Sequence, residues 1–357
     1  MSRQTTVVMS LAAQEDNLGD IEIRSVLLTW LQASNNELLL YRGTMSDSYI
    51  NAYPLKGKYR LFLSYFALQL ALLMAFFSGK RIVFCIAPGP QIVSASWRAR
   101  LRDLLAFINI KIARLSGGRA IIVGRSYRGN PAHARLIQAY ARQADILTFR
   151  DDISSPVLNG LGEVSPDLGF FAQQQGTKDR DLAVLVLREA QFISSDIFSN
   201  FVAAARAEGL KPTVVVQVHR DNKLAQELAT KYGMDLVDWG QETHHQQTEK
   251  VEAIYARTAI IISNRLHGLI MGVRIGAIPF TLTSSKDTKL VPTMRVVMSN
   301  CRPIDLEQMS TISVSDWRSR IQDAISPESC DLVQQDLYRA RQRLHDLELR
   351  VEGLVKD

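Results

Sequence analysis

The sequence predicts an α/β protein made of two Rossmann-like domains, each built on a parallel sheet, with a helix at the C-terminal end. Three observations support this fold class. Short continuous apolar runs alternate with amphipathic segments along most of the 357 residues, as expected for parallel strands covered by helices on both faces. The polar stretch 172–181 interrupts the series, which then restarts. The length is about twice that of one usual domain.

In the first half of the chain, apolar runs and amphipathic stretches alternate from residue 5 onwards. Strands are predicted at 5–13, 37–43, 80–91, 119–129 and 146–154. Helices are predicted at 21–34, 61–78, 96–118 and 131–145. The strand 80–91 is expected to run into a Gly/Pro loop, and 119–129 into a polar loop.

The second half repeats the pattern. Strands are predicted at 182–190, 211–221, 234–239, 259–268 and 277–285, and helices at 194–209, 222–233, 248–258 and 269–276. The predicted domains are 1–172 and 180–310, with a helical segment at 311–357. Two parallel sheets joined in this way are expected to face a cleft that binds ligand at the carboxyl ends of the strands.

Composition and charge narrow the class of protein. Apolar residues make up 46% and charged residues 22%, and the net charge of +6 comes from 42 basic and 36 acidic residues. Because this excess is mild and the bases are scattered, we do not predict nucleic-acid binding. The mild positive charge is equally consistent with a small anionic substrate and with an anionic membrane surface. The three cysteines show neither disulfide nor zinc spacing, and the first residues do not resemble a signal peptide, so a cytoplasmic location is expected.

Residues 61–78 are uncharged, and the basic residues on their flanks are Lys56, Lys58, Arg60, Lys80 and Arg81. Their length is at the lower limit for a membrane-spanning helix. We favour a buried or groove-lining helix, because a strand follows directly and the rest of the chain alternates in the same way. A peripheral contact with the inner face of the cell membrane stays open, since an apolar face with basic flanks suits an interfacial helix.

The C-terminal segment has a heptad spacing of apolar residues, with charges between them. The spaced residues are Val333, Leu337, Ala340, Leu344, Leu347, Val351 and Leu354. A coiled-coil arm that forms a homodimer and a single long helix packed against its own chain are both consistent with this spacing.

Several nucleotide and hydrolase motifs are missing. No GxGxxG follows the first strand, and neither GxxxxGK[ST] nor GxSxG occurs. The DRD at 179–181 matches a metal-binding pattern, but it lies in a hydrophilic linker. We therefore predict no metal site.

The segment SNRLHG at 263–268 is the strongest local signal. If it is extended, Arg265 and His267 alternate and point the same way. Gly268 would let a helix begin close to an anionic ligand. The alternative is that Arg265 pairs with a carboxylate and His267 has a structural role.

Other arginines lie towards the C-terminal ends of predicted strands, namely Arg125, which Ser126 follows, Arg150 and Arg188. An arginine at the end of a buried strand is costly without an anionic partner, which could be a carboxylate of the chain or a ligand. Several guanidinium groups around one cleft suit a ligand with both a carboxylate and a phosphate.

Other polar residues can be interpreted as helix caps or as solvent-exposed loop residues. Asn17, Gly19 and Asp20 precede the first helix, where they either cap it or hold a sugar hydroxyl. In VHRD at 218–221 we favour a capping aspartate with an exposed histidine, and we expect His244 and His245 to be solvated in a loop.

These segments together resemble the polysaccharide pyruvyl transferase family. NLGDIEI, VGRSYRG, ILTFRDDIS, SPDLGFF and VLVLR are similar to that family's motifs, in the same order. The segment ISNRLHGLIMGVRIGAIPF resembles its S-x-R-L-H-x-x-I-x-A-x-x-x-G-x-P signature, and the similarity extends over residues 17 to 280. GRSYRG lacks the usual Ile-Gly-Pro ending, and CIAPGPQ stands where the family has a run of glycines.

The resemblance implies a fold like that of the GT-B glycosyltransferases. It also implies transfer of the enolpyruvyl group of phosphoenolpyruvate onto two hydroxyls of a sugar, in an exopolysaccharide or its lipid-linked precursor, with no further cofactor. On this basis we assign His267 as general acid/base, and Arg265 and Arg188 to the phosphate and carboxylate. The candidate substrate-binding residues are Asn17, Gly19, Asp20, Arg125, Ser126, Arg150, Asp167, Gly268 and Lys289. The alternatives are a nucleotide-sugar glycosyltransferase and a non-catalytic partner in exopolysaccharide assembly.

Overall fold

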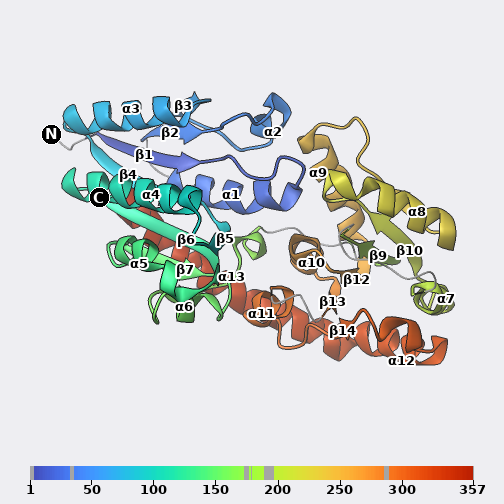
Figure 1. Cartoon of the computed structure of the whole chain (residues 1–357). Helices are drawn as coiled ribbons and strands as arrows, with labels where there is room; N and C mark the ends of the chain where they lie inside the picture. The colour runs from blue at the N-terminus through green and yellow to red at the C-terminus, as the bar shows by residue number, and fades with distance from the viewer. Residues whose placement is uncertain are drawn as a thin grey trace. The chain divides into compact units, whose positions relative to one another are not determined.

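The computed structural model describes residues 4–32, 36–172, 177, 179–188, 197–284 and 289–356. The chain divides into two compact units. Unit 1 contains Met1–Glu15, Asp20–Leu168 and Gln342–Asp357, and unit 2 contains Asp16–Gly19 and Gly169–Arg341. Each unit has its own parallel sheet (Figure 1). The division differs from the predicted one, because 311–341 belongs to unit 2 and the end of the chain belongs to unit 1.

The sheet of unit 1 has the order β3-β2-β1-β4-β6-β7-β8, with β5 paired to β6. Its strands are β1 Thr5–Ser10, β2 Glu37–Tyr41, β3 Lys58–Phe62, β4 Arg81–Ile86, β5 Gly89–Val93, β6 Arg119–Gly129, β7 Ile146–Phe149 and β8 Glu163–Val164. The pairings are parallel. Runs such as TTVVMS and RIVFCI favour central strands because their branched side chains pack well on both faces of a covered sheet.

The helices of unit 1 are α1 Leu18–Leu31, α2 Asp47–Asn51, α3 Tyr65–Phe77, α4 Trp97–Leu115, α5 Arg135–Ala141 and α6 Ser154–Val157. Apolar residues of α3, α4 and α5 join those of β1, β2, β4 and β6 in one core cluster. These three helices therefore cover the same face of the sheet, as Figure 1 shows.

Three strands of this sheet, β3, β5 and the two-residue β8, were not predicted. The expected Gly/Pro loop contains β5, which pairs with the second half of β6 from Gly89↔Arg125 to Val93↔Gly129. The sequence 119–129 is thus strand throughout, although a polar loop was expected at its end. The first residues of the predicted helix 61–78 instead finish β3, an edge strand beside β2.

The sheet of unit 2 has the order β11-β10-β9-β12-β13-β14, and its pairings are parallel. Its strands are β9 Leu182–Val186, β10 Lys211–Val215, β11 Asp235–Val237, β12 Thr258–Ser263, β13 Ile278–Thr283 and β14 Pro303–Asp305. Its helices are α7 Ser199–Ala207, α8 Asn222–Tyr232, α9 His244–Ala256, α10 Leu266–Val273, α11 Leu290–Arg295 and α12 Val314–Ala324. The start of the predicted helix 194–209 lies outside the described residues. β9 and β12 are fully buried, so polar residues that follow them emerge at the carboxyl edge of a covered sheet.

The last helix, α13 Pro327–Lys356, buries six of the seven residues of the predicted heptad stripe, whereas Leu354 is partly exposed and Val355 is buried instead. The buried members are Val333, Leu337, Ala340, Leu344, Leu347 and Val351, each at most 3% exposed. The chain itself therefore covers the stripe, which confirms the alternative of a long helix packed against its own chain. Across the described ranges, no helix combines the length and the apolar character needed to span a membrane.

Candidate active site

The carboxyl edge of the unit 2 sheet brings the three predicted catalytic residues close together in the backbone. β9 and β12 are neighbours, and their pairing ends at Ser263↔Val186. Arg188 follows β9 by two residues, and Arg265 follows β12 by two residues. His267 comes next, in the first turn of α10. Strand order alone thus places these side chains at one edge.

A small hydrogen-bonded turn joins β12 to α10. The Ser263 hydroxyl donates to the carbonyl of Val186 and accepts from the N–H of Arg265, at 2.8 Å for the second bond. The Asn264 side-chain oxygen accepts from the N–H of Arg188 at 2.7 Å. These bonds tie the ends of the two strands together, so the turn has a defined geometry.

The prediction that Arg265 and His267 alternate on an extended segment is wrong. Only Arg265 has extended backbone, with φ −101° and ψ 119°, and it is the N-cap of α10. His267 is helical, because the chain turns into α10 immediately after the strand. The two side chains are therefore positioned by a strand end and a helix start.

Arg265 forms a two-point ion pair with Asp221. Its Nε and Nη2 atoms donate to the two carboxylate oxygens at 2.8 and 2.7 Å. Asp221 follows β10 on the far side of β9 and is 3% exposed. Asp221 is the N-cap residue of α8 and His219 is exposed, as expected, but the Asp221 side chain forms no capping hydrogen bond and binds Arg265 instead. The position of Asp221 after a buried strand was the available sequence signal.

His267 lies directly against Gly19. A Cβ atom built on Gly19 would come within 2.3 to 2.4 Å of the Cβ, Cγ and Nδ1 atoms of His267. Real Cβ atoms do not approach so closely, so only glycine leaves room for the imidazole here. His267 is partly exposed.

The segment Asp16–Gly19 belongs to unit 2 and is held there by backbone bonds. Asn17 forms a β-bridge with Val218, and the N–H of Leu18 donates to the carbonyl of Gln217 at 3.3 Å. The Asn17 side chain accepts from the N–H of Gly19 at 3.1 Å. Asn17 therefore acts as a turn residue that keeps Gly19 beside His267.

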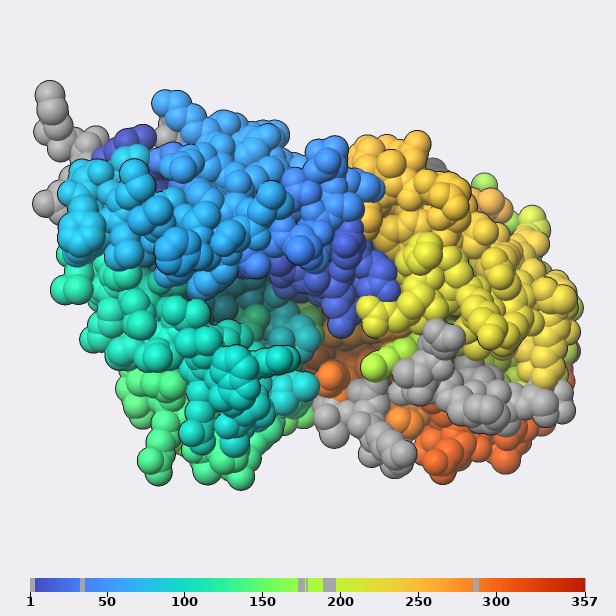
Figure 2. Space-filling model, turned by 45° about the horizontal axis from the view of Figure 1, so that its top comes forward, coloured from blue at the N-terminus to red at the C-terminus, as the bar shows by residue number. Residues whose placement is uncertain are grey.

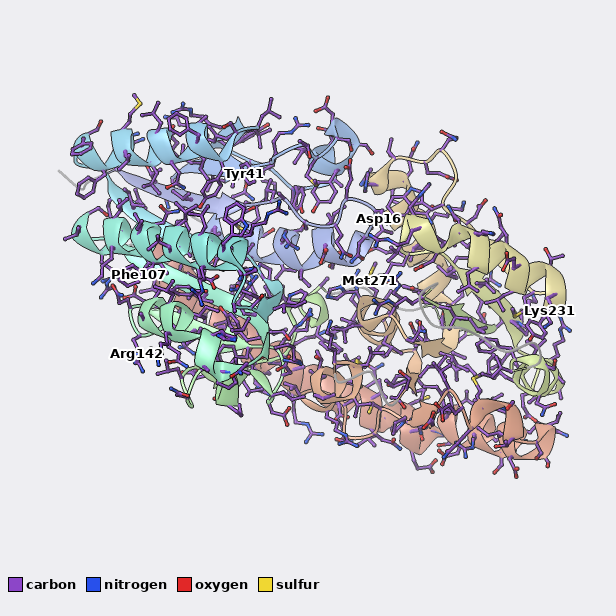
Figure 3. The ribbon with its side chains drawn as sticks, in the orientation of Figure 1. Asp16, Tyr41, Phe107, Arg142, Lys231 and Met271 are labelled. Atoms are coloured by element: carbon purple, nitrogen blue, oxygen red, sulfur yellow. The ribbon has the colours of Figure 1, made fainter. Side chains whose placement is uncertain are left out.

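An ion pair at the surface also fixes this segment. Arg220 donates to both carboxylate oxygens of Asp16, a residue labelled in Figure 3. The hydrogen bond from Arg220 holds the pKa of Asp16 below its usual range. The pair is half-exposed, so we regard it as a positional contact that adds little to stability.

Gly268 has a packing role. A Cβ atom on it would lie 2.9 Å from Cγ1 of Val186 and 3.0 Å from the hydroxyl oxygen of Ser263. The glycine lets α10 begin close to β9 and β12, which brings the first turn of the helix to the sheet edge. This packing explains why residue 268 is a glycine, and no bound ligand is needed for that explanation.

Arg188 differs from the expectation for a buried-strand arginine. β9 ends at Val186, and Arg188 is exposed. Solvent therefore reaches its guanidinium group, and the predicted cost of a buried charge does not arise here.

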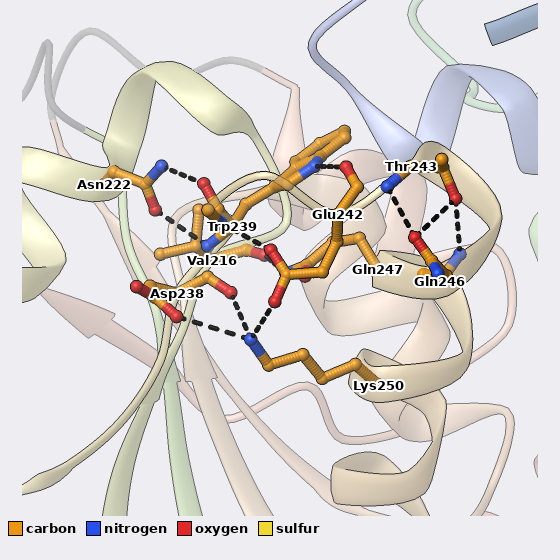
Figure 4. A network of polar contacts seen from close by, with 10 residues as sticks. Val216, Asn222, Asp238, Trp239, Glu242, Thr243, Gln246, Gln247 and Lys250 are labelled. Atoms are coloured by element: carbon orange, nitrogen blue, oxygen red, sulfur yellow. Dashed lines mark hydrogen bonds and ion pairs between the residues drawn. The ribbon is translucent and has the colours of Figure 1, made fainter. Parts of the chain in front are cut away.

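The loop after β11 is fixed by a polar network, which Figure 4 shows from close by. Lys250 donates to the Asp238 carbonyl at 3.0 Å and to the Glu242 carboxylate at 2.9 Å. Asn222 bonds to both the N–H and the carbonyl of Trp239. The ring of His244 packs edge-on against Trp239, at 5.1 Å between centroids.

The expectation of a solvated loop at 244–245 is therefore wrong for His244. It begins α9 and is 8% exposed. Thr243 caps this helix with Gln246 in a capping box. His245, one residue on, is exposed and lies beside Glu249.

In unit 1, Arg125 and Ser126 lie inside β6, so the prediction that they end a strand is wrong. Arg125 donates to the carbonyl of Ala87 at 2.8 Å and also bonds to the Gln91 side chain. Ser126 is 2% exposed and hydrogen bonds to Asp151. Both therefore have partners within their own sheet.

Arg150 and Asp167 form a buried ion pair. Arg150 Nη1 lies 2.9 Å from Asp167 Oδ2, and the side chains are 5% and 2% exposed. The sequence left open whether the anionic partner of Arg150 is a carboxylate of the chain or a ligand, and in the structure it is the Asp167 carboxylate. Asp20, at the start of α1, accepts from the N–H of Gln14 and pairs with Arg24 at 3.5 Å.

Next to this pair, Asp151 is completely buried and binds Arg128 at two points, 3.1 and 2.9 Å. It also accepts from the N–H and the hydroxyl of Ser154. At the carboxyl edge of the unit 1 sheet, these arginines and carboxylates therefore neutralise one another's charge.

Two remaining predictions concern charged residues in unit 2. Lys289 is exposed and is the N-cap of α11. Asp181, from the DRD segment, pairs with Arg257 and Lys211. In the part of the chain that the structure describes, no group of three or more His, Cys, Asp or Glu side chains is arranged to hold a metal ion.

Comparison with known proteins identifies the family. A model of polysaccharide pyruvyl transferases matches residues 17–276, well over half of the chain. The chain belongs to the polysaccharide pyruvyl transferase family. The matched range begins at Asn17 and includes Arg188, Arg265 and His267. Membership makes the chain a transferase. A search of curated proteins finds no match.

Solved structures share the fold of this family member. The lipopolysaccharide outer core galactosyltransferase WaaB is 11% identical with a TM-score of 0.54, covering 99% of this chain and 100% of that one. A putative UDP-N-acetylglucosamine 2-epimerase from Listeria monocytogenes is 9% identical, with a TM-score of 0.51 and coverage of 97% and 95%.

UGT2 of Phytolacca americana, in complex with UDP-2fluoro-glucose and pterostilbene, is 8% identical, with a TM-score of 0.51 and coverage of 98% and 99%. The predicted GT-B fold is confirmed. Because one of these neighbours is described as an epimerase, the fold alone does not determine the reaction.

Proposed function

We propose that this pyruvyl transferase moves the enolpyruvyl group of phosphoenolpyruvate onto two hydroxyls of a sugar, giving a cyclic pyruvate ketal. The observation that carries the proposal is the arrangement of Arg188, Arg265 and His267 at the carboxyl edge of the unit 2 sheet, within the range of the family match. The acceptor we propose is a sugar of a bacterial exopolysaccharide or its lipid-linked precursor.

In the proposed reaction, a proton adds to the methylene carbon of phosphoenolpyruvate, and C2 becomes electrophilic. A sugar hydroxyl forms a bond to C2, the bond from C2 to the phosphate oxygen breaks, and inorganic phosphate leaves. The second hydroxyl then closes the ketal on C2. The two hydroxyl protons are accounted for by the new methyl group and the departing phosphate. The donor itself is the only small molecule required besides the acceptor.

We assign the proton transfer to His267, because an imidazole titrates near neutral pH and can both give and accept a proton. Its place beside Gly19 fixes the ring on one side. His267 is partly exposed, which suits contact with a substrate. His267 would protonate the methylene carbon and then take a proton from a hydroxyl.

We assign anion binding to Arg265 and Arg188. Asp221 engages the Nε and Nη2 edge of Arg265. Among the contacts of the described residues, this geometry leaves Nη1 for a donor oxygen. Arg188 is exposed at the next strand end and suits the second anionic group. Asp221 would be a positioning residue that orients Arg265.

The other predicted binding residues receive different roles in this proposal. Asn17 and Gly19 shape the wall beside His267, and Gly268 brings α10 to the sheet. Arg125, Ser126, Arg150 and Asp167 stabilise the edge of unit 1, and Asp20 the start of α1. Because the chain buries its own heptad stripe, we do not propose a homodimer through that stripe.

The test is a transfer assay with purified protein, phosphoenolpyruvate and a panel of β-galactosides, glucosides and mannosides. We expect release of phosphate and a product heavier by one pyruvate ketal. Thermal unfolding with phosphoenolpyruvate alone should show stabilisation by the donor. Absence of both responses, with saturable binding of UDP-glucose, would favour the glycosyltransferase alternative. No binding of any substrate would favour the non-catalytic partner.

A further inference from the structure

Helix α3 is apolar on both of its faces. Leu68, Ala71, Leu72 and Ala75 are buried against the sheet. On the opposite face, the exposed residues follow the helical repeat and are between 38% and 80% exposed: Phe66, Leu70, Leu73, Met74 and Phe77. The outer face of a helix in a water-soluble protein is normally polar. The prediction of a buried helix at 61–78 is therefore correct for only one face.

Helix α4 carries a second exposed apolar stripe, and here basic residues lie beside it. Trp97, Leu101, Leu104, Ile108 and Leu115 recur at helical spacing and are between 41% and 75% exposed. Five basic residues on the same helix are also exposed: Arg98, Arg100, Arg102, Lys111 and Arg114. The guanidinium of Arg98 lies over the Trp97 ring, 5.5 Å from its centroid.

The two helices are neighbours on one side of the unit 1 sheet. The side chain of Asn109 on α4 donates to the hydroxyl of Tyr65 on α3 at 3.2 Å. Both helices cover the same core cluster. Figure 2 shows the surfaces of α3, in light blue, and α4, in turquoise, on the same face. We call this exposed surface of α3 and α4 the α3–α4 face.

The charge of this part of the chain is strongly one-sided. Residues 48–144 contain 15 Lys and Arg but only one acidic residue, Asp103. The rest of the chain holds the remaining 27 basic residues against 35 acidic ones. Asp103 is itself buried and bonds to Gln91 and Arg102. The edge strand β3 adds the exposed Lys58 and Arg60 next to α3.

We propose that the α3–α4 face docks on the surface of an anionic lipid bilayer. Exposed aromatic and aliphatic side chains enter the boundary between headgroups and acyl chains, and flanking arginines and lysines contact anionic headgroups. Tryptophan and arginine together are typical of that boundary. The surplus of positive charge favours a lipid surface over a second copy of this chain, whose matching face would repel it.

This docking is independent of the reaction proposed above, since it uses neither donor nor acceptor. It would bring unit 1 to the membrane on which a lipid-linked sugar is carried.

The test is co-sedimentation of the full chain with phosphatidylcholine vesicles, with and without phosphatidylglycerol. We expect binding to the vesicles that contain phosphatidylglycerol and weaker binding as salt rises. The variants Phe66→Ser/Phe77→Ser and Arg98→Gln/Arg100→Gln should each weaken binding by roughly tenfold or more. These residues are exposed, so circular dichroism and thermal unfolding should match those of the wild type.

The matched control is Tyr338→Ser/Leu349→Ser, two exposed apolar residues of α13 that are 65% and 55% exposed. This variant should bind vesicles as the wild type does. The proposal is overturned if wild-type protein does not sediment with phosphatidylglycerol, or if all variants bind equally. It is also overturned if sedimentation velocity shows a dimer that Phe66→Ser/Phe77→Ser abolishes. Turnover of a soluble acceptor by that variant should be normal, which separates this proposal from the reaction.

Discussion

The carboxyl edges of the two sheets hold similar residues in different environments. In unit 1, Arg150, Asp151 and Asp167 are at most 4% exposed, and the arginines bind carboxylates of the same unit. In unit 2, Arg188 is exposed and His267 is partly exposed. An arginine that follows an apolar strand is therefore a structural element in one unit and a candidate ligand-binding group in the other. Exposure separates Arg188 from Arg150, whereas Arg265 shares a bound carboxylate with the arginines of unit 1 and is itself only partly exposed.

The largest expected effect is on the stability of the protein, through the buried ion pairs at the carboxyl edge of the unit 1 sheet. Asp151→Ala removes the carboxylate that binds Arg128 and Ser154, and leaves a mostly buried guanidinium without it. We expect the free energy of unfolding to fall by roughly 3–5 kcal/mol. Urea unfolding followed by circular dichroism measures it.

The control is Glu163→Ala, which breaks a pair with Arg350 between side chains that are 64% and 46% exposed. Such a surface pair contributes about 0–1 kcal/mol. Equal losses in the two variants would show that burial does not distinguish the two kinds of ion pair.

The next largest effect is on turnover at the carboxyl edge of the unit 2 sheet. His267→Ala should lower the rate of phosphate release from phosphoenolpyruvate by about a hundredfold or more, because the variant has no group to move the proton. The exposed His245→Ala in the same unit should keep the wild-type rate. Near-normal turnover of His267→Ala would remove His267 from the chemistry.

A smaller effect is expected from Gly19→Ala. The added methyl group meets the His267 ring, so the ring or the segment Asp16–Gly19 must shift. Displacement of a catalytic group by such an amount should lower kcat by roughly tenfold to a hundredfold. Gly353→Ala, where a Cβ atom meets nothing within 4 Å, serves as the control. A wild-type kcat for Gly19→Ala would mean that the position of the ring is unimportant.

The smallest effect is on the pH dependence of stability. Burial alone would raise the pKa of Asp151, but hydrogen bonds from Arg128, Ser154 and Ser126 hold it below the ordinary value of 3.8. A carboxyl whose pKa is lowered in the folded state stabilises the protein above its unfolded pKa of about 3.9, and this contribution is lost as pH falls through the folded-state pKa. Unfolding of the wild type should therefore depend more steeply on pH below about 5 than unfolding of Asp151→Asn. Identical slopes would contradict this.

The sequence predicted the parts of the fold that local patterns determine. The buried strands β1, β9 and β12 are continuous apolar runs, and each was found near its predicted position. The RLH segment was correctly expected at the end of a strand, because a polar run after a buried strand must emerge at the edge of the sheet.

Long-range pairing could not be predicted in the same way. β5 lies in a stretch that contains Gly89 and Pro90, and it is a strand only because β6 continues beside it. The partner of Arg265 depends on strand order, since Asp221 reaches it across the end of β9. The sequence left open whether 61–78 is buried or has an exposed apolar face, because its apolar run has no periodicity that would separate a buried side from an exposed one.

The most direct measurement compares two arginines, one from each edge. Arg188→Met and Arg125→Met are assayed for kcat and KM with phosphoenolpyruvate at saturating acceptor. We predict that Arg188→Met raises KM for the donor by roughly tenfold or more, through loss of a charge-assisted contact. Arg125→Met should leave that KM unchanged, because Arg125 bonds to Ala87 and Gln91 in its own unit. The opposite result, a raised KM in Arg125→Met with Arg188→Met at the wild-type value, would contradict a donor site at the edge of unit 2.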